Sequence, residues 1–367
     1  MRTLQFLLAM STVLLAQAPA PAVNSPEVHA DRWITFRLRA PKANQVTFSG
    51  DWMKIGDTLA MQRDDPGVWS VTTAALPPSV YLYNFTVDGV NIADPVNPRI
   101  KLRSQTSASM VEVRGEPAET PWQARDVPHG AVEINWVNSK VLEGDPRWVW
   151  IYTPPGYAKS GNRRYPVLYL FHGSNDIAGG WTLAGQMNFI FDNLLSEKKV
   201  EPMIVVMPYG HAVPFGSPRE KQARNTEMFE RHLLEDVMPM VDAKYRVKPG
   251  RDQHAIAGLS MGGGQAIAIG FRHLDRFSAI GAFSSAIPQD FEKQFDGALT
   301  ASKATNAKLK VLWIGCGRDD SAFERNEKFA AMLQSKGIRN TWRATDGNHT
   351  YTYWRKYLAE FAPLLFR

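Results

Sequence analysis

The sequence predicts an α/β protein with a mostly parallel sheet, preceded by a small all-β domain. Two patterns carry this prediction. Between residues 27 and 115, short apolar–polar alternations of period two follow one another without a helical period. Beyond residue 129, near-continuous apolar runs alternate with helical stretches, which is typical of a sheet covered on both faces. The chain has 367 residues, enough for about two domains, and its hydrophobic content of 44% indicates well-packed cores.

Residues 1–20 are typical of a secretory signal peptide. Met1-Arg2-Thr3 gives a short positive start, an apolar run follows from Leu4 to Ala16, and small residues come next. The run is too short to remain as a membrane-spanning helix. We therefore expect cleavage between Ala16 and Ala22, a secreted or periplasmic protein, and no stable membrane anchor.

Composition excludes several classes of function. The net charge is +6, but the basic residues are spread thinly, so no nucleic-acid-binding surface is expected. The single cysteine, Cys316, cannot form an internal disulfide. No His/Cys/Asp cluster has metal-ligand spacing and no phosphate-type glycine loop is present, so we predict neither a metal nor a cofactor. The sequence does not indicate an oligomeric state.

The segment 27–115 is predicted to be a small sandwich of the immunoglobulin-like type. Its strands alternate apolar and polar residues, and Asp88-Gly89 marks a hairpin turn. The expected strands contain Ile34 to Leu38, Val46 to Phe48, Trp69 to Val71, Tyr81 to Val87 and Met110 to Val113.

This segment resembles the glycogen-binding-type sandwich found at the N-terminus of glycan-active enzymes. The resembling motifs are Val46 to Trp52, Gly67-Val68-Trp69, Tyr81 to Gly89 and Ala93-Asp94-Pro95. Trp52 stands where that family often has a stacking tryptophan. However, Asn84 replaces a common sugar-binding lysine, and Val90-Asn91-Ile92 lacks the second tryptophan. We therefore expect a docked domain that shapes or shields a catalytic cleft, in preference to a starch-binding domain.

Residues 116–128, rich in Glu, Pro and Arg, are predicted to be a linker, and residues 129–367 a second domain. The second domain alternates strands and helices. Its expected strands are Trp148 to Thr153, Val167 to Phe171, Ile204 to Met207, Ala255 to Ala257, Ala279 to Phe283, Lys310 to Ile314 and Thr341 to Ala344. Helices are expected at Asn188 to Lys198, Met228 to Val241, from Gln265, at Glu324 to Lys336 and after Tyr353.

A G-x-S-x-G motif, Gly258-Leu259-Ser260-Met261-Gly262, lies between one of these strands and the following helix. The pattern predicts a buried strand, a turn too tight for side chains at both glycines, and a helix. Such a turn presents a serine hydroxyl at the helix N-terminus, as a nucleophile requires. Ser260 is therefore the predicted nucleophile.

A serine nucleophile needs a base, which in turn is held by a carboxylate. In a parallel sheet, active groups gather at the carboxyl ends of the strands. His349 follows the last strand and is the predicted base, with His211 as its rival. For the acid, Asp320 is preferred to Asp319 and Asp346, although spacing alone does not separate them. The order Ser, Asp, His matches that of α/β-hydrolases.

The same logic predicts the groups around the reacting carbonyl. Two backbone N–H groups, those of Met261 and Ser174, are expected to form the oxyanion hole. Trp181, Tyr351 and Trp354 are candidates to line a pocket for an aromatic acid or a sugar ring, although such aromatic residues are more often part of a core.

From about Val127 to the C-terminus the chain contains several motifs in a fixed order: Asp126 to Gly130, Tyr152 to Tyr157, Tyr165 to Gly173, Gly258 to Gly263, Gly317 to Asp320 and Gly347 to Thr350. In these motifs it resembles carbohydrate esterase family 1, the feruloyl and acetylxylan esterases of the esterase D-like group. Carried over by position, the family's triad falls on Ser260, Asp320 and His349. Tyr351 departs from the family, where tryptophan is frequent, and this leaves the acyl group open.

The resemblance implies a secreted serine esterase that removes feruloyl or acetyl groups from a plant cell-wall polysaccharide or oligosaccharide such as xylan. Three alternatives remain: hydrolysis of a siderophore ester of the enterochelin type, acyl transfer to a sugar, and a glycan-binding protein with an inactive hydrolase domain.

Overall fold

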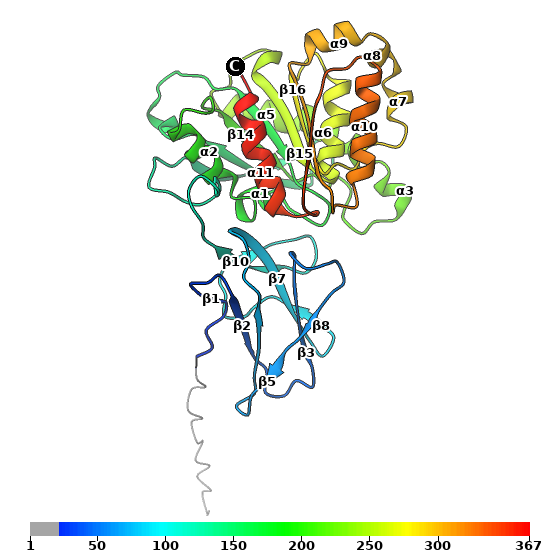
Figure 1. Ribbon diagram of the computed structural model, residues 1–367. Coiled ribbons are helices and arrows are strands. Elements are labelled where there is room, and N and C mark those ends of the chain that lie inside the picture. Colours follow the sequence, from blue (N-terminus) through cyan, green and yellow to red (C-terminus); the bar gives the residue numbers. More distant parts are fainter. Residues whose placement is uncertain (1–21) are drawn as a thin grey trace, which may run out of the picture.

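The computed structural model describes residues 22–367 (Figure 1), so the predicted signal peptide lies outside the described residues. An all-β part is followed by an α/β part, and Figure 1 shows the first below the second. Within residues 22–367, no helix combines the length and the apolar character needed to cross a bilayer.

Ten short strands form two sheets in the N-terminal part. Every strand pairing in these sheets is antiparallel, and their orders are β1-β2-β6-β5 and β4-β3-β7-β10-β9, with β8 pairing β7. The strands are β1 (Glu27–Val28), β2 (Ile34–Arg39), β3 (Val46–Gly50), β4 (Leu59–Ala60), β5 (Gln62–Arg63), β6 (Val68–Thr73), β7 (Ser79–Val87), β8 (Val90–Ile92), β9 (Ile100–Lys101) and β10 (Ala108–Val113).

Alternating apolar residues from both sheets form one buried cluster, which includes Phe36, Phe48 and Phe85. The predicted hairpin turn is confirmed, because Asp88 and Gly89 both have positive φ angles, 46° and 88°, and join β7 to β8. Two antiparallel sheets around one core agree with the expected sandwich, while its exact limits stay a prediction.

An eight-stranded sheet forms the centre of the α/β part, in the order β11-β12-β14-β13-β15-β16-β17-β18. All its pairs from β14 to β18 are parallel, and β11 and β12 pair antiparallel, so the predicted mostly parallel sheet is confirmed. The strands are β11 (Ala131–Asn138), β12 (Pro146–Thr153), β13 (Val167–Phe171), β14 (Ile204–Pro208), β15 (His254–Leu259), β16 (Ala279–Phe283), β17 (Val311–Gly317) and β18 (Thr341–Thr345).

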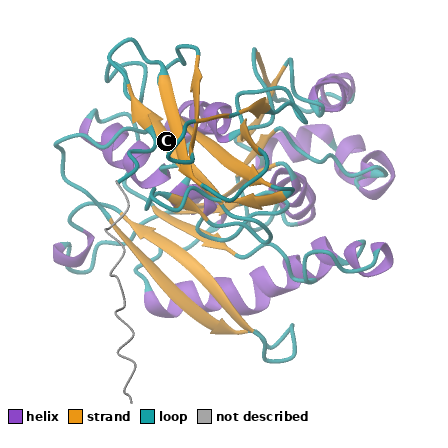
Figure 2. Cartoon of the chain, turned by 90° about the horizontal axis from the view of Figure 1, so that it is seen from below, coloured by secondary structure: helices purple, strands orange, loops and turns teal. Residues whose placement is uncertain are grey.

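Helices lie on both sides of this sheet, as Figure 2 shows. They are α1 (Gly180–Leu183), α2 (Met187–Ser196), α3 (Arg219–Gln222), α4 (Asn225–His232), α5 (Met238–Lys244), α6 (Met261–Arg272), α7 (Phe291–Gln294), α8 (Asp296–Thr300), α9 (Ser302–Lys308), α10 (Phe323–Ser335) and α11 (Tyr351–Phe361). Short 3₁₀ turns occur at Tyr157–Lys159, Arg251–Gln253 and Ala362–Leu364.

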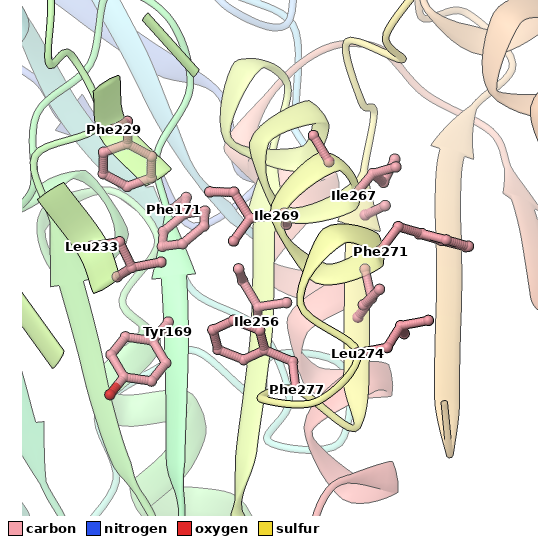
Figure 3. Packing of buried hydrophobic residues seen from close by; sticks show 14 of the residues in the cluster. Tyr169, Phe171, Phe229, Leu233, Ile256, Ile267, Ile269, Phe271, Leu274 and Phe277 are labelled. Atoms are coloured by element: carbon pink, nitrogen blue, oxygen red, sulfur yellow. The ribbon is translucent and has the colours of Figure 1, made fainter. Parts of the chain in front are cut away.

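Two apolar clusters cover the two faces of the sheet. On one face, α4, α6 and α10 pack on the central strands, and Figure 3 shows Ile269 of α6 beside Phe171 and Ile256. On the other face, α2 and α11 pack over a cluster that includes Trp354. Burial on both faces explains why the central strands read as continuous apolar runs.

Two of the differences from the sequence prediction concern β11 and the helix after α3. Strand β11, at the edge of the sheet, was not predicted, although Val132, Ile134 and Trp136 alternate with polar residues as in a strand. The helix expected at Met228 to Val241 is broken into α4, a π-helical turn at Leu233–Val237 and α5. Pro239 lies in the first turn of α5 and cannot donate a backbone hydrogen bond, which accounts for the widened turn before it.

Buried polar contacts join the two parts. The Arg355 guanidinium on α11 donates to Ser79 Oγ at 2.9 Å and to the carbonyl of Val80 at 2.6 Å, both on β7. Lys101 on β9 forms a buried ion pair with Asp176, in the loop after β13. The N-terminal part therefore lies against the carboxyl-end rim of the sheet, where an active site is expected.

Candidate active site

Ser260 occupies a strained turn between β15 and α6. Its backbone angles are φ 51° and ψ −117°, a conformation that side chains rarely adopt and that the surrounding structure must maintain. A Cβ atom on Gly258 would lie 2.4 Å from Gly262, and one on Gly262 would lie 2.4 Å from the carbonyl oxygen of His172. The predicted turn, too tight for side chains at both glycines, is therefore confirmed.

His349 and Asp320 come from the loops after β18 and β17, and they contact each other. The Nδ1 atom of His349 lies 2.8 Å from Oδ2 of Asp320, whose side chain is fully buried. The other carboxylate oxygen, Oδ1, accepts from the N–H of Ala322 at 2.8 Å. Burial alone would raise the pKa of Asp320, but the hydrogen bond and charge of His349 and the Ala322 N–H bring the pKa below its usual range.

The structure separates the three candidate acids. Asp319 accepts a hydrogen bond from the N–H of Gly347, and the side chain of Asp346 is 95% exposed. Asp320 is the candidate that contacts the His349 ring. Its catalytic role stays a prediction.

Ser260 and His349 line one cavity of about 210 Å³. Ser260 and His349 thus line the same space, and among the described residues no hydrogen bond joins the Ser260 hydroxyl to the imidazole. A separation of this kind is common in proteins without a bound substrate, where catalytic hydrogen bonds are often long.

Both predicted oxyanion donors lie beside the nucleophile. Met261 is the first residue of α6, where backbone N–H groups have no partner within the helix. Ser174 lines the cavity, and the preceding Gly173 is so close that a Cβ atom there would lie 3.3 Å from Ser260 Cβ. Met261 follows the serine directly in the chain and Ser174 lines its cavity, so their N–H groups stay the predicted donors.

His172 braces this loop. Its Nδ1 lies 2.8 Å from the carbonyl oxygen of Gly173, and its Nε2 accepts from the N–H of Gly210 at 2.8 Å. Burial lowers the pKa of His172. A neutral ring with its proton on Nδ1 satisfies both bonds.

The predicted aromatic residues divide into two groups. Tyr351 and Trp354 line the cavity, and the Trp354 indole packs edge-on against the His349 ring at 4.9 Å between centroids. Trp181 does not line it: the residue is fully buried, donates its indole N–H to the carbonyl of Phe171, and packs edge-on behind Tyr351. The expectation that Trp181 contacts substrate is therefore wrong. Trp181 instead supports the Tyr351 ring from behind.

The rival base, His211, lies elsewhere. It is buried beside His172 and Tyr209 and does not line the cavity. Burial lowers the pKa of His211 to about 4. A ring in this position has no access to the Ser260 hydroxyl.

Sequence reasoning missed four charged residues that line the same cavity: Asp51, Lys101, Arg103 and Asp176. Asp176 accepts from the Tyr351 hydroxyl at 2.7 Å and pairs with Lys101. It follows the β13 strand by five residues, so the strand-end rule could have found it. The other three belong to the N-terminal part, and no local motif predicts where a docked domain places its side chains.

No group of three or more His, Cys, Asp or Glu side chains within residues 22–367 has the arrangement of a metal site. The site offers a serine, an imidazole bonded to a carboxylate, and backbone donors, which together suit attack on a carbonyl.

Comparison with known families agrees with this chemistry. The model of the Esterase family ("Putative esterase") matches residues 139–365, more than half of the chain. The chain belongs to this esterase family. It is thus related to enzymes that cleave carboxylic esters, and the prediction of an esterase with an α/β-hydrolase fold is confirmed.

Among the individual relatives are feruloyl esterases. An endo-1,4-beta-xylanase/feruloyl esterase from Xylanibacter ruminicola is 29% identical over 358 residues, covering 95% of this chain and 46% of the relative. The chain thus spans less than half of that relative's length. A solved ferulic acid esterase is 28% identical, with a TM-score of 0.56, and covers 64% of this chain and 97% of its own.

An enterochelin esterase from Shigella flexneri resembles the chain over a greater length. Its TM-score is 0.67 over 92% of this chain and 94% of its own, at 19% identity. At that identity the likeness shows the fold alone. Because it covers 92% of the chain, it includes N-terminal strands as well as the α/β part.

Proposed function

We propose that the protein is a serine esterase that hydrolyses an acyl ester on a cell-wall polysaccharide or oligosaccharide, with a feruloyl group as the preferred acyl group. The observation that carries this proposal is the hydrogen bond of His349 to buried Asp320 at the cavity that Ser260 also lines. The similarity to the xylanase/feruloyl esterase over 95% of the chain supports the acyl group and the substrate class.

In this mechanism, Nε2 of His349 removes the proton of Ser260 as the hydroxyl oxygen attacks the ester carbonyl. Asp320 holds Nδ1–H, which keeps Nε2 free to accept a proton, and stabilises the imidazolium that forms. The N–H groups of Met261 and Ser174 bind the negative oxygen of the tetrahedral intermediate. The imidazolium then protonates the departing alcohol, and water releases the acid from the acyl-enzyme by the reverse sequence of proton transfers.

The cavity supports an acyl group with an aromatic ring. Tyr351 and Trp354 provide apolar ring faces and edges, and Leu259 adds an aliphatic wall. The Tyr351 hydroxyl is engaged with Asp176, so the Tyr351 ring is held in place. A pocket of about 210 Å³ accommodates one substituted ring and not a ring with a sugar as well.

Hydrolysis of a siderophore ester is the second candidate, because the enterochelin esterase fold covers 92% of the chain. Substrates distinguish the two. Purified protein should release ferulic acid from methyl ferulate and from feruloylated xylan oligosaccharides at a higher kcat/KM than it cleaves a 2,3-dihydroxybenzoyl-serine ester. The opposite order would favour the siderophore, and absence of cleavage of all three would contradict the esterase proposal.

We further propose that the protein is exported, with residues 1–20 removed, as the leader-like sequence indicates. Mass spectrometry of the chain recovered outside the cytoplasm gives the mature N-terminus directly. Recovery of full-length chain from the cytoplasm alone would contradict export.

A further inference from the structure

A second cavity adjoins the one that holds Ser260. It has a volume of about 280 Å³ and is lined largely by the N-terminal part, mainly by residues 49–57. The two cavities share five lining residues, Asp51, Leu82, Arg103, His349 and Thr350. A ligand larger than one ring can therefore extend from the first cavity into the second past the His349 ring.

The distribution of catalytic groups assigns a direction to the two cavities. Ser260 and Ser174 line only the first, so the carbonyl and its acyl chain lie there. His349 lines both, and His349 is the group that must protonate the leaving alcohol. The alcohol side of the ester consequently points toward the second cavity.

The lining of the second cavity is suited to hydroxyl groups. It combines acceptors and donors of both charges, among them Asp51, Lys54, Asp57 and Arg103. Asp51 Oδ2 is buried without a hydrogen-bond partner in the described part of the chain. Its Oδ1 accepts from the N–H of Leu82, which fixes the carboxylate at the junction of the cavities.

Arg103 is the most available donor at this junction. Among residues 22–367 it forms no ion pair and donates no hydrogen bond, although it lines both cavities. By contrast, Lys101, two residues earlier, is neutralised by Asp176. A half-buried guanidinium beside a carboxylate with a vacant oxygen can bind neighbouring hydroxyl groups of one sugar ring.

The aromatic residue that would serve an independent glycan site is not available for that purpose. Trp52 is partly buried and packs against the N-terminal core, with its ring centroid 6.2 Å from that of Phe36 and 5.3 Å from that of Tyr81. Asn84, at the common lysine position, uses its amide to hold the carbonyls of Ile92 and Ser107. Beside His349, by contrast, the N-terminal part places charged groups in the lining of the second cavity.

We infer that the second cavity is the subsite for the sugar that carries the acyl group, and that Arg103 and Lys54 of the N-terminal part bind its hydroxyls. This inference rests on the proposed esterase function and gives the N-terminal part a role within the active site. The chemical class recognised is a neutral sugar ring esterified at one hydroxyl.

The test compares two esters of the same acid, methyl ferulate and a feruloyl ester of a pentose oligosaccharide. Variants R103A and K54A are measured beside R114A, an exposed arginine of the same part that lines neither cavity. For each variant, kcat/KM for the sugar ester is divided by kcat/KM for methyl ferulate. This ratio should fall roughly tenfold in R103A and K54A, because each variant loses one hydrogen bond from a charged donor to the sugar. It should stay at the wild-type value in R114A.

A second readout does not depend on turnover. In an S260A background, calorimetry should give a Kd for the feruloyl oligosaccharide that rises roughly tenfold on adding R103A or K54A. Unchanged ratios and unchanged Kd values in both variants would overturn the inference while leaving the esterase proposal intact. If wild type cleaves neither ester, the proposed function fails, and the Kd values still decide whether the cavity binds the sugar. Lys54 is exposed, so K54A provides a result even if R103A folds poorly.

Discussion

Replacement of Asp320 by asparagine tests the role of the buried acid in the proposed Ser260–His349–Asp320 triad. Asp320 Oδ1 accepts from the N–H of Ala322, and Oδ2 lies 2.8 Å from His349 Nδ1. An asparagine keeps the first bond only by turning its oxygen toward Ala322. Its amide N–H₂ then faces Nδ1, which must lose its proton, and the proton moves to Nε2. His349 in that tautomer cannot accept the Ser260 proton.

The expected loss follows from this change of tautomer. The side chain is fully buried, so water does not restore the original arrangement. We expect kcat for methyl ferulate to fall on the order of 10³- to 10⁴-fold. This loss corresponds to about 4 to 5 kcal/mol of transition-state stabilisation.

Two neighbouring carboxylates serve as controls. Asp319 bonds a backbone N–H and Asp346 is exposed, and neither bonds the His349 ring. D319N and D346N should retain kcat within about tenfold of wild type, since each loses at most one hydrogen bond away from the ring. Circular dichroism and thermal midpoints establish that all three variants are folded. A D320N enzyme with more than a tenth of wild-type kcat would refute the reasoning.

The remaining predictions concern stability. Arg355→Met should lower the free energy of unfolding by about 3 to 5 kcal/mol in urea titrations, because it removes two hydrogen bonds that a charged donor makes to buried atoms of β7. Lys356→Met, at the exposed next position of α11, should cost less than about 1 kcal/mol, and equal losses would contradict this account. Burial raises the pKa of Asp51 from 3.8 to about 6, although the Leu82 N–H and the Arg355 charge oppose this. Between those values Asp51 binds more protons in the folded state than in the unfolded state, so its own contribution to stability decreases as pH rises from about 4 to 6. Asp51→Asn should abolish up to about 3 kcal/mol of that decrease. Parallel urea-derived stability curves for the two proteins between pH 3.5 and 7.5 would show that Asp51 does not titrate in this way.

The sequence predicted those features that depend on residues close together in the chain. Continuous apolar runs predicted β13 to β17 because both faces of those strands are covered. The glycines around Ser260 predicted the strained turn, since no side chain fits there. The strand-end rule placed His349 and Asp320 at one rim, where they make their hydrogen bond.

The sequence was insufficient wherever the outcome depends on how distant segments dock. Trp181 lies near the carboxyl ends of the strands, and its ring could in principle stack on a substrate. Its indole instead turns into the core and donates to the carbonyl oxygen of Phe171. Arg103 and Lys101 follow no motif, and they reach the cavity because Arg355 and the apolar cluster around Leu82 hold the two parts together. Such contacts join residues separated by 70 positions or more, which no short pattern encodes.

The central claim is that Ser260 carries the acyl group during turnover. Intact-protein and peptide mass spectrometry after treatment with a fluorophosphonate, which reacts with activated serines, tests it most directly. One adduct on the peptide containing Ser260, absent from S260A and accompanied by complete loss of esterase activity, is the predicted result. Labelling at another residue, or esterase activity that persists in S260A, would contradict the account.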